Sequence, residues 1–189
     1  TLKVIPSNVD LAGAEIEFVG RDHREKILST PLKAVETEYE FIVIDCPPSL
    51  GLLTLNALAI SQSVLIPMQC EYYALQGLSH LLKTLKRVKK SINPGLKVEG
   101  IILTMYDNRT LLAGQVESQV KTYFGDFLMK TIIPRNIRLS EAPSHGQPII
   151  LYASRSKGSD SYVELAQEVI QRTKNETAKV EQHQIESVA

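Results

Sequence analysis

Asp45 is the residue of this chain whose surroundings most clearly point to chemistry. It ends an apolar run, Phe41 to Ile44, and is followed at once by a cysteine, two prolines and a serine. A carboxylate at the carboxyl end of a buried parallel strand is the arrangement in which open α/β folds hold the magnesium ion of a nucleoside triphosphate. A carboxylate that only caps the next helix is the alternative, and position alone leaves both interpretations open.

No phosphate-binding glycine loop accompanies this aspartate. Such a loop has the spacing GxxxxGK[ST], in which the lysine and the hydroxyl meet the phosphates. The nearest glycine pair, Gly95 and Gly100, is followed by two isoleucines. The sequence therefore predicts one half of a nucleotide site, and Thr1 at position 1 is equally consistent with a fragment and with a processed chain.

Other candidate groups are weaker. Four histidines and two cysteines lie too far apart for the usual metal-ligand spacings, so we expect no metal site built from them. One predicted helix carries five cations within eight residues and no acid, and these either attract an anionic polymer or form a solvated face. They are Lys83, Lys86, Arg87, Lys89 and Lys90.

The composition is that of an ordinary soluble domain. The chain has 189 residues, 43% hydrophobic and 22% charged, with 21 basic and 21 acidic side chains. Zero formal net charge means that any nucleic-acid contact must come from a local patch. No apolar run approaches the ~20 residues of a membrane span, and the first residues lack a secretory pattern, so we expect a cytoplasmic protein without a membrane contact.

Short apolar runs alternate with amphipathic segments along the chain. Such alternation predicts an α/β fold with a mostly parallel sheet and helices on both faces. Pro31 either kinks the second helix or starts a new one capped by Thr30. Strands are expected at 2–5, 41–45, 64–67 and 98–104, and helices near 10–18, 21–38, 51–60, 74–90, 112–123 and 162–170.

Two further stretches stand apart from this alternation. Residues 134–148 lack periodicity and are rich in proline, glycine and polar side chains, which favours a functional loop over filler. After Thr173 the chain becomes polar. We therefore expect a domain over residues 1–173 and a polar, disordered tail over 174–189.

From Leu2 nearly to Arg172 the chain resembles the ParA/Soj family of deviant Walker ATPases, which segregate chromosomes and plasmids. The resemblance implies a P-loop NTPase-like fold that is truncated at its N-terminus. It rests on four separate stretches: LAGAEIE at 11–17, DCPPSLG at 45–51, QCEYYAL at 69–75 and IPRNIRLSEAPSHG at 133–146.

The resemblance assigns roles to individual residues. Asp45 becomes the Walker B aspartate, which reaches Mg²⁺ through water, and Pro47, Pro48 and Gly51 lie in the switch that senses the γ-phosphate. Two further sets are implied to lie around the adenine base and to contact DNA without sequence preference. They are Met105, Pro134 and Asn136 for the base, and Arg109 and Arg138 for DNA, where ordinary surface ion pairs are the alternative.

Family members use ATP and Mg²⁺, form a homodimer when ATP is bound, act on the nucleoid in the cytoplasm and are stimulated by a ParB-type centromere-binding protein. The signature lysines, the P-loop hydroxyl and the switch aspartate are expected upstream of Thr1, so this chain is expected to contain no catalytic residue. Because phosphoryl transfer depends on those groups, we expect the chain alone neither to bind ATP tightly nor to hydrolyse it.

Three alternatives follow from the same residues. The first is a non-catalytic, truncated binding module that docks a partner or DNA without hydrolysis. The second is the MinD-like membrane branch, which the tail after Thr173 disfavours because it has no apolar face. The third, an iron–sulfur scaffold, lacks the CxxC pair it needs.

Overall fold

The computed structural model of this chain describes the backbone of residues 2–186 and the side chains of residues 2–175. The chain divides into two compact units. The first contains Thr1–Val64 and Lys83–Lys97, and the second contains Leu65–Leu82 and Val98–Ala189. The predicted division into a domain at 1–173 and a tail at 174–189 stays a prediction.

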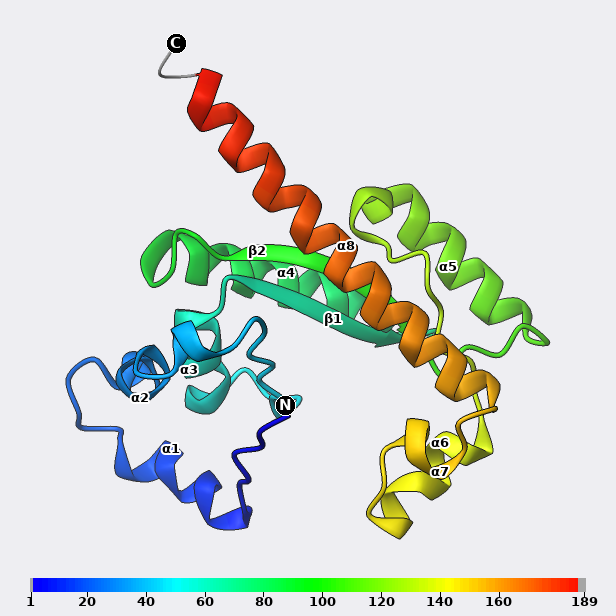
Figure 1. Cartoon of the computed structure of the whole chain (residues 1–189), viewed down its shortest axis with the longest axis horizontal. Coiled ribbons are helices and arrows are strands. Elements are labelled where there is room, and N and C mark those ends of the chain that lie inside the picture. The colour runs from blue at the N-terminus through cyan, green and yellow to red at the C-terminus, as the bar shows by residue number, and fades with distance from the viewer. Residues whose placement is uncertain (1, 187–189) are drawn as a thin grey trace. The chain divides into compact units, whose positions relative to one another are not determined.

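The first unit is built from short helical turns around one regular helix. Residues 10–18 are helical as expected, beginning with a 3-10 turn. The elements are η1 (Val9–Gly13), α1 (Ala14–Glu17), η2 (Arg24–Lys26), α2 (Ser29–Lys33), η3 (Glu36–Glu38) and α3 (Leu52–Ile60) (Figure 1).

Asn56 organises this unit from inside α3. Its side chain is buried, and its amide nitrogen donates to the carbonyl of Arg24 at 2.8 Å. Its side-chain oxygen accepts the backbone N–H of Leu28 at 3.1 Å. An amide among the apolar residues of α3 thus ties the segment around η2 to the helix, because a buried polar group is stable only when its hydrogen bonds are made.

Two sequence predictions for this unit are wrong. The segments 2–5 and 41–45 are not β-strands, since neither pairs with another backbone segment in the described part of the chain. The predicted helix over 21–38 is broken into η2, α2 and η3, and α2 begins at Ser29, so Thr30 lies inside it rather than capping it. Pro31, the third residue of α2, has a place in the first turn where its missing N–H costs little.

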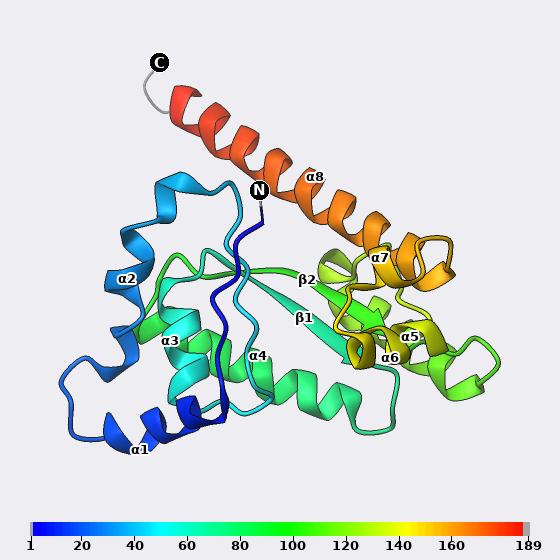
Figure 2. The same ribbon diagram turned by 60° about the horizontal axis from the view of Figure 1, so that its bottom comes forward.

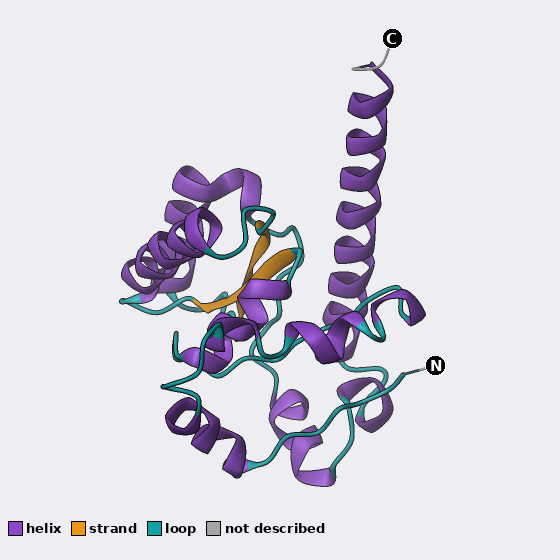
Figure 3. Ribbon diagram, turned by 90° about the vertical axis from the view of Figure 1, so that its left-hand side faces the viewer, coloured by secondary structure: helices purple, strands orange, loops and turns teal. Residues whose placement is uncertain are grey.

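The second unit contains most of the sheet. Strands β1 (Ser63–Gln69) and β2 (Lys97–Thr104) are neighbours, joined by α4 (Ala74–Ser91), and both arrows point the same way in Figures 1 and 2. Their ranges confirm the strands expected at 64–67 and 98–104. Within the described residues, strand colour in Figure 3 is confined to these two segments.

A third segment runs alongside β2 without being a regular strand. The N–H of Met129 donates to the carbonyl of Ile101 at 2.8 Å, and the N–H of Ile133 donates to that of Leu103 at 2.9 Å. Parallel bridges join Ile101 to Leu128 and Tyr106 to Pro134. Residues 128–135 therefore lie beside β2 as a further parallel segment of the sheet. Their backbone pairing with β2 continues into the loop that follows the strand.

Helices pack against this sheet, which confirms the α/β fold class. Ile102, Met129 and Ile133 form a buried cluster, against which Leu165 and Val169 of α8 pack. In Figure 1, α8 crosses in front of the strands. The remaining elements are α5 (Leu111–Phe124), η4 (Gly125–Phe127), α6 (Ile137–Glu141), η5 (Ala142–His145), α7 (Ile149–Tyr152) and α8 (Lys157–Glu186).

Helix α8 closes the open edge of segment 128–135. The carboxylate of Glu168 accepts the backbone N–H groups of Lys130 and Thr131, both at 2.8 Å. Burial raises the pKa of this carboxyl, but those hydrogen bonds outweigh burial and hold the pKa below its usual value. Arg172 pairs with Glu168 at 3.1 Å and donates to the carbonyl of Leu128 at 3.0 Å. Side chains thus satisfy edge groups that another strand would otherwise pair with.

Helix α8 continues past Thr173 to Glu186, so its backbone includes most of the stretch expected as a tail. No helix among the described residues has the length and apolar character that a membrane crossing needs.

Candidate functional site at the carboxyl end of β2

Met105, the residue directly after β2, has an unusual backbone conformation. Its φ is 48°, in the left-handed region that non-glycine residues seldom occupy, and its side chain is 43% exposed. Such conformations persist where the surroundings hold them, and they cluster at functional sites. The sequence alone gives no sign of this backbone geometry.

Tyr106, the residue after Met105, forms backbone hydrogen bonds with the loop around Pro134. The N–H of Tyr106 donates to the carbonyl of Ile133 at 3.0 Å, and the N–H of Arg135 donates to the carbonyl of Tyr106 at 2.9 Å. These bonds place Met105 and Pro134, two of the three residues predicted to lie near a base, at adjacent strand ends. The parallel pairing of 128–135 with β2 produces this approach.

Tyr106 also has a side-chain anchor that sequence reasoning missed. Its hydroxyl donates to the carboxylate of Glu117 on α5 at 2.5 Å. This hydrogen bond, together with burial and the charge of Glu117, raises the pKa of Tyr106 to about 12. Burial and the same carboxylate also raise the pKa of Cys70.

Asn136, the third predicted base contact, begins the short helix α6. Its side-chain oxygen accepts the N–H of Arg138 at 2.8 Å, as a helix cap does. The amide nitrogen of this side chain makes no hydrogen bond within the described residues, so it is free to donate. Leu139 fixes α6 against α8, because a Cβ on Gly158 would lie 2.7 Å from the Cγ of Leu139.

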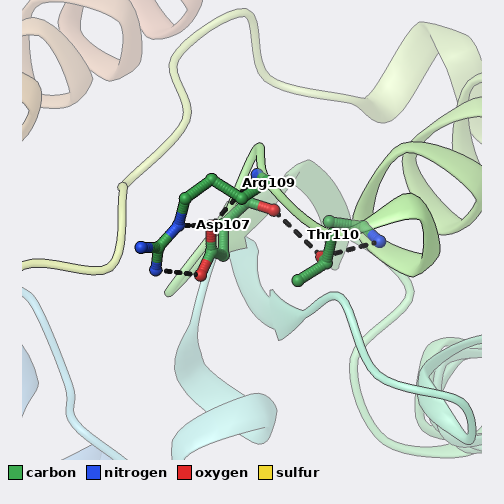
Figure 4. Close-up of polar contacts among 4 residues, drawn as sticks. Asp107, Arg109 and Thr110 are labelled. Carbon is green, nitrogen blue, oxygen red and sulfur yellow. Dashed lines mark hydrogen bonds and ion pairs between the residues drawn. The ribbon is translucent and has the colours of Figure 1, made fainter.

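Arg109 lies in the loop between β2 and α5 and pairs with Asp107 (Figure 4). Its Nε and Nη2 atoms donate to the two carboxylate oxygens at 2.9 and 2.7 Å. These bonds and the backbone N–H of Arg109, helped by the charge of Arg135, hold the pKa of Asp107 far below its usual value. Thr110 completes the loop by accepting the N–H of Ala113 at 3.4 Å and so capping α5.

Arg138 has a similar partner in Glu141. Its Nη1 atom donates to the carboxylate of Glu141 at 2.8 Å, and the hydroxyl of Tyr152 donates to the same oxygen at 3.1 Å. The bond from Arg138 is the main reason that the pKa of Glu141 is lowered. His145 stacks on Tyr152 with ring centroids 4.8 Å apart. Both arginines predicted to contact DNA thus sit in ion pairs, which was the alternative interpretation.

Asp45 lies in the first unit, on the extended segment that precedes α3. Its carboxylate takes part in no hydrogen bond or ion pair within the described residues, and its charge, after burial, raises the pKa of the neighbouring Cys46 thiol. No group of three or more His, Cys, Asp or Glu that could hold a metal occurs among the described residues. One free carboxylate still suits Mg²⁺, which keeps several waters and uses few protein ligands beside phosphates.

The predicted switch residues border the start of α3. Pro47 and Pro48 are exposed, and Gly51 is the cap residue of the helix. A side chain at position 51 would collide with the carboxylate of Glu15, which also accepts the N–H of Leu53 at 3.4 Å. A larger residue here would therefore have to displace the Glu15 side chain. The role of these residues in sensing a phosphate stays a prediction.

Comparison with known proteins supplies the context for these residues. Residues 1–98 match a family described as an AAA domain. The chain is 60% identical over 168 residues to the sporulation initiation inhibitor protein Soj of Bacillus subtilis, covering 89% of this chain and 66% of that protein. It is 56% identical over 171 residues to the chromosome partitioning protein ParA of Myxococcus xanthus, covering 90% and 60%. It is 54% identical to the chromosome-partitioning ATPase Soj of Treponema pallidum, covering 90% and 68%.

Solved structures share the fold. A cobyrinic acid a,c-diamide synthase from Mycobacterium smegmatis is 34% identical with a TM-score of 0.74, covering 89% of this chain and 62% of that one. A second structure of that synthase holds ADP and magnesium. The cell division ATPase MinD of Pyrococcus furiosus, at 24% identity and a TM-score of 0.63, covers 78% of this chain and 58% of its own and shows the fold alone.

The parallel sheet, its helices and these structural neighbours define a P-loop NTPase-like α/β protein. Within that class, identities of 54–60% leave no ambiguity about kinship, and the chain belongs to the ParA/Soj family. It spans about two thirds of the length of the curated relatives it matches, between 60% and 68%.

Proposed function

We propose that the complete gene product containing this chain is a chromosome or plasmid partitioning ATPase. It binds ATP and Mg²⁺, forms a homodimer when ATP is bound, holds non-specific DNA on the nucleoid in the cytoplasm and responds to a ParB-type protein. High identity to proteins named as chromosome partitioning proteins supports the family activity. The observation that carries the proposal is the backbone pairing at the carboxyl end of β2. The residues proposed to contact the base and DNA follow the two segments that are paired there.

This chain supplies only part of the nucleotide chemistry. Asp45 would hold Mg²⁺ through water, and Met105, Pro134 and the free amide of Asn136 would lie near the base. Bound Mg²⁺ neutralises charge on the phosphates during transfer. Among residues 1–189 no GxxxxGK[ST] loop grips those phosphates. Tight binding and turnover therefore belong to the complete gene product.

Magnesium-dependent ATP turnover tests this division of labour. The complete gene product is expected to hydrolyse ATP, and its Asp45→Asn variant is expected to lose most of that activity, since one Mg²⁺ anchor is gone. The 189-residue chain alone is expected to show no turnover above background. Appreciable magnesium-dependent turnover by this chain would contradict the proposal.

The DNA contact rests on two exposed guanidinium groups. The side chain of Arg109 is 82% exposed and that of Arg138 is 58% exposed. Planar, permanently charged guanidiniums suit phosphate oxygens, which set position without conveying sequence. The backbone segments that carry them leave the sheet side by side, because Arg135 bonds to Tyr106.

Retention on a mixed-sequence DNA duplex tests this contact. With ATP and Mg²⁺, Arg109→Ala and Arg138→Ala variants of the complete gene product are expected to lose salt-sensitive binding. Arg155, exposed and outside the two ion pairs, provides the control substitution Arg155→Ala. Retention equal to wild type in both test variants would remove these residues from the site.

A non-catalytic binding module is the second candidate. The absence of a phosphate-binding loop from residues 1–189 favours it. If the complete gene product carries no such loop, it should dock DNA or a partner without any response to ATP. ATP-dependent DNA retention would exclude this candidate.

A further inference from the structure

The two candidate DNA-binding arginines share a local design. Each donates to a carboxylate only a few residues away, Arg109 to Asp107 and Arg138 to Glu141. In each pair the arginine is the more exposed partner: 82% against 20% in the first, and 58% against 37% in the second. The guanidiniums are thus presented to solvent, with a carboxylate behind each one.

Each carboxylate also has a donor other than the guanidinium. Asp107 accepts the backbone N–H of Arg109 at 3.1 Å and feels the positive charge of Arg135. Glu141 accepts the hydroxyl of Tyr152 at 3.1 Å. A carboxylate that keeps a hydrogen bond after its arginine departs avoids most of the cost of an unpaired charge. The guanidiniums are therefore held in place yet easily released.

We propose that Asp107 and Glu141 are intramolecular competitors of phosphate, which pre-position Arg109 and Arg138 and weaken the binding of a DNA backbone to them. The proposal rests on the proposed function, because it concerns the regulation of the same DNA contact. Phosphate oxygens must replace carboxylate oxygens at each guanidinium. The free energy of DNA binding therefore gains only the difference between the phosphate and the carboxylate interaction. Such attenuation suits a protein that must leave DNA as readily as it binds.

The size of the effect follows from the exposure of the pairs. Exposed ion pairs are weak, so removing one competitor should tighten binding about two- to fivefold. The two pairs lie on different elements and have no residue in common, so the gains of the two substitutions should multiply approximately. Both replacements, Asp107→Asn and Glu141→Gln, keep the shape and the oxygen that accepts the second donor.

The experiment measures the affinity of the complete gene product, with ATP and Mg²⁺, for a mixed-sequence DNA duplex at fixed salt. Glu164→Gln on α8 is the matched control, since Glu164 is exposed and has no ion pair in the described residues. Glu141→Gln and Asp107→Asn should each bind more tightly than this control, and the double variant most tightly. Tightening no greater than that of Glu164→Gln would overturn the proposal.

A double-mutant cycle separates competition from a general charge effect. In an Arg138→Ala background the gain from Glu141→Gln should vanish, because nothing remains to be released. A gain that persists there would overturn the proposal. If Arg138→Ala alone leaves DNA affinity unchanged, the proposed function fails. If it lowers affinity while Glu141→Gln does not raise it, only the competition fails.

Discussion

Two apolar segments of this chain, Lys97–Thr104 and Phe41–Asp45, look alike in sequence and differ in structure. The first is β2, in which Ile101 and Leu103 are fully buried. The second is extended but unpaired within the described residues, and Val43 is 90% exposed. β2 has backbone partners on both sides, β1 and residues 128–134. Apolar composition selects which segments are able to form strands, and backbone partners decide which do.

This difference bears directly on the candidate site. The backbone of the residues that follow β2 is also held by hydrogen bonds, because the pairing beside β2 continues to Tyr106 and Arg135. Asp45 and the prolines after it follow a segment without a ladder, and they are held mainly where α3 begins against Glu15. The segments proposed to contact the base and DNA thus have more backbone hydrogen bonding in this chain than the segment that carries Asp45, the proposed magnesium ligand.

The largest expected effect comes from truncating one residue in each apolar segment. Leu103→Ala should lower the free energy of unfolding by about 2–5 kcal/mol, because it removes a fully buried side chain. Val43→Ala should change it by less than about 0.5 kcal/mol. Urea unfolding of the 189-residue chain compares the two. Equal losses would mean that the 41–45 segment is buried in solution.

Glu168→Gln tests how the edge of the paired region is closed. Losing charge from a carboxylate that accepts two backbone N–H groups should cost about 1–3 kcal/mol. Because the folded pKa of Glu168 is lowered, its contribution is complete above the unfolded value of about 4.3 and is lost as pH falls through the folded pKa. Urea unfolding should therefore separate variant from wild type at neutral pH and less in strong acid. Glu164→Gln is the control, and an equal loss there would contradict this role.

Glu117→Gln gives a smaller effect, about 0.5–1.5 kcal/mol. Without that carboxylate the pKa of Tyr106 should fall from about 12 toward the usual value near ~10. Since the folded pKa is raised, this contribution is complete below about pH 10 and is lost as pH rises through the folded value. Tyrosinate absorbance during an alkaline titration measures the shift, with Tyr106→Phe identifying the signal. An unchanged titration would remove Glu117 as the anchor.

The sequence predicted the fold class, β1, β2, α4 and α5, because the apolar residues of these segments follow the pattern of a buried strand or of an amphipathic helix. It placed strands wrongly at 2–5 and 41–45, since periodicity carries no information about backbone partners. The stretch 134–148 has no single period because its helical elements, α6 and η5, are only five and four residues long.

For the candidate site, the family motifs named Met105 and Pro134, which the structure brings to neighbouring backbone segments, and the roles of these residues stay a prediction. The motifs could not show that the backbone of Met105 is left-handed. They also could not show that Asp107 and Glu141 form ion pairs with the two arginines. Those features depend on side-chain geometry within short loops. Glu117 and Glu168 escaped notice because their partners are distant in sequence, a tyrosine hydroxyl in one case and two backbone N–H groups in the other.

Amide hydrogen exchange of the 189-residue chain tests the central claim most directly, namely that the ladder beside β2 orders one part of the site while the Asp45 segment lacks such support. The amides of Met129, Ile133 and Arg135 should exchange slowly, because each donates to a carbonyl of β2 or Tyr106. Those of residues 42–45 should exchange at nearly the rate of an unfolded chain. Comparable protection in both segments would contradict the account.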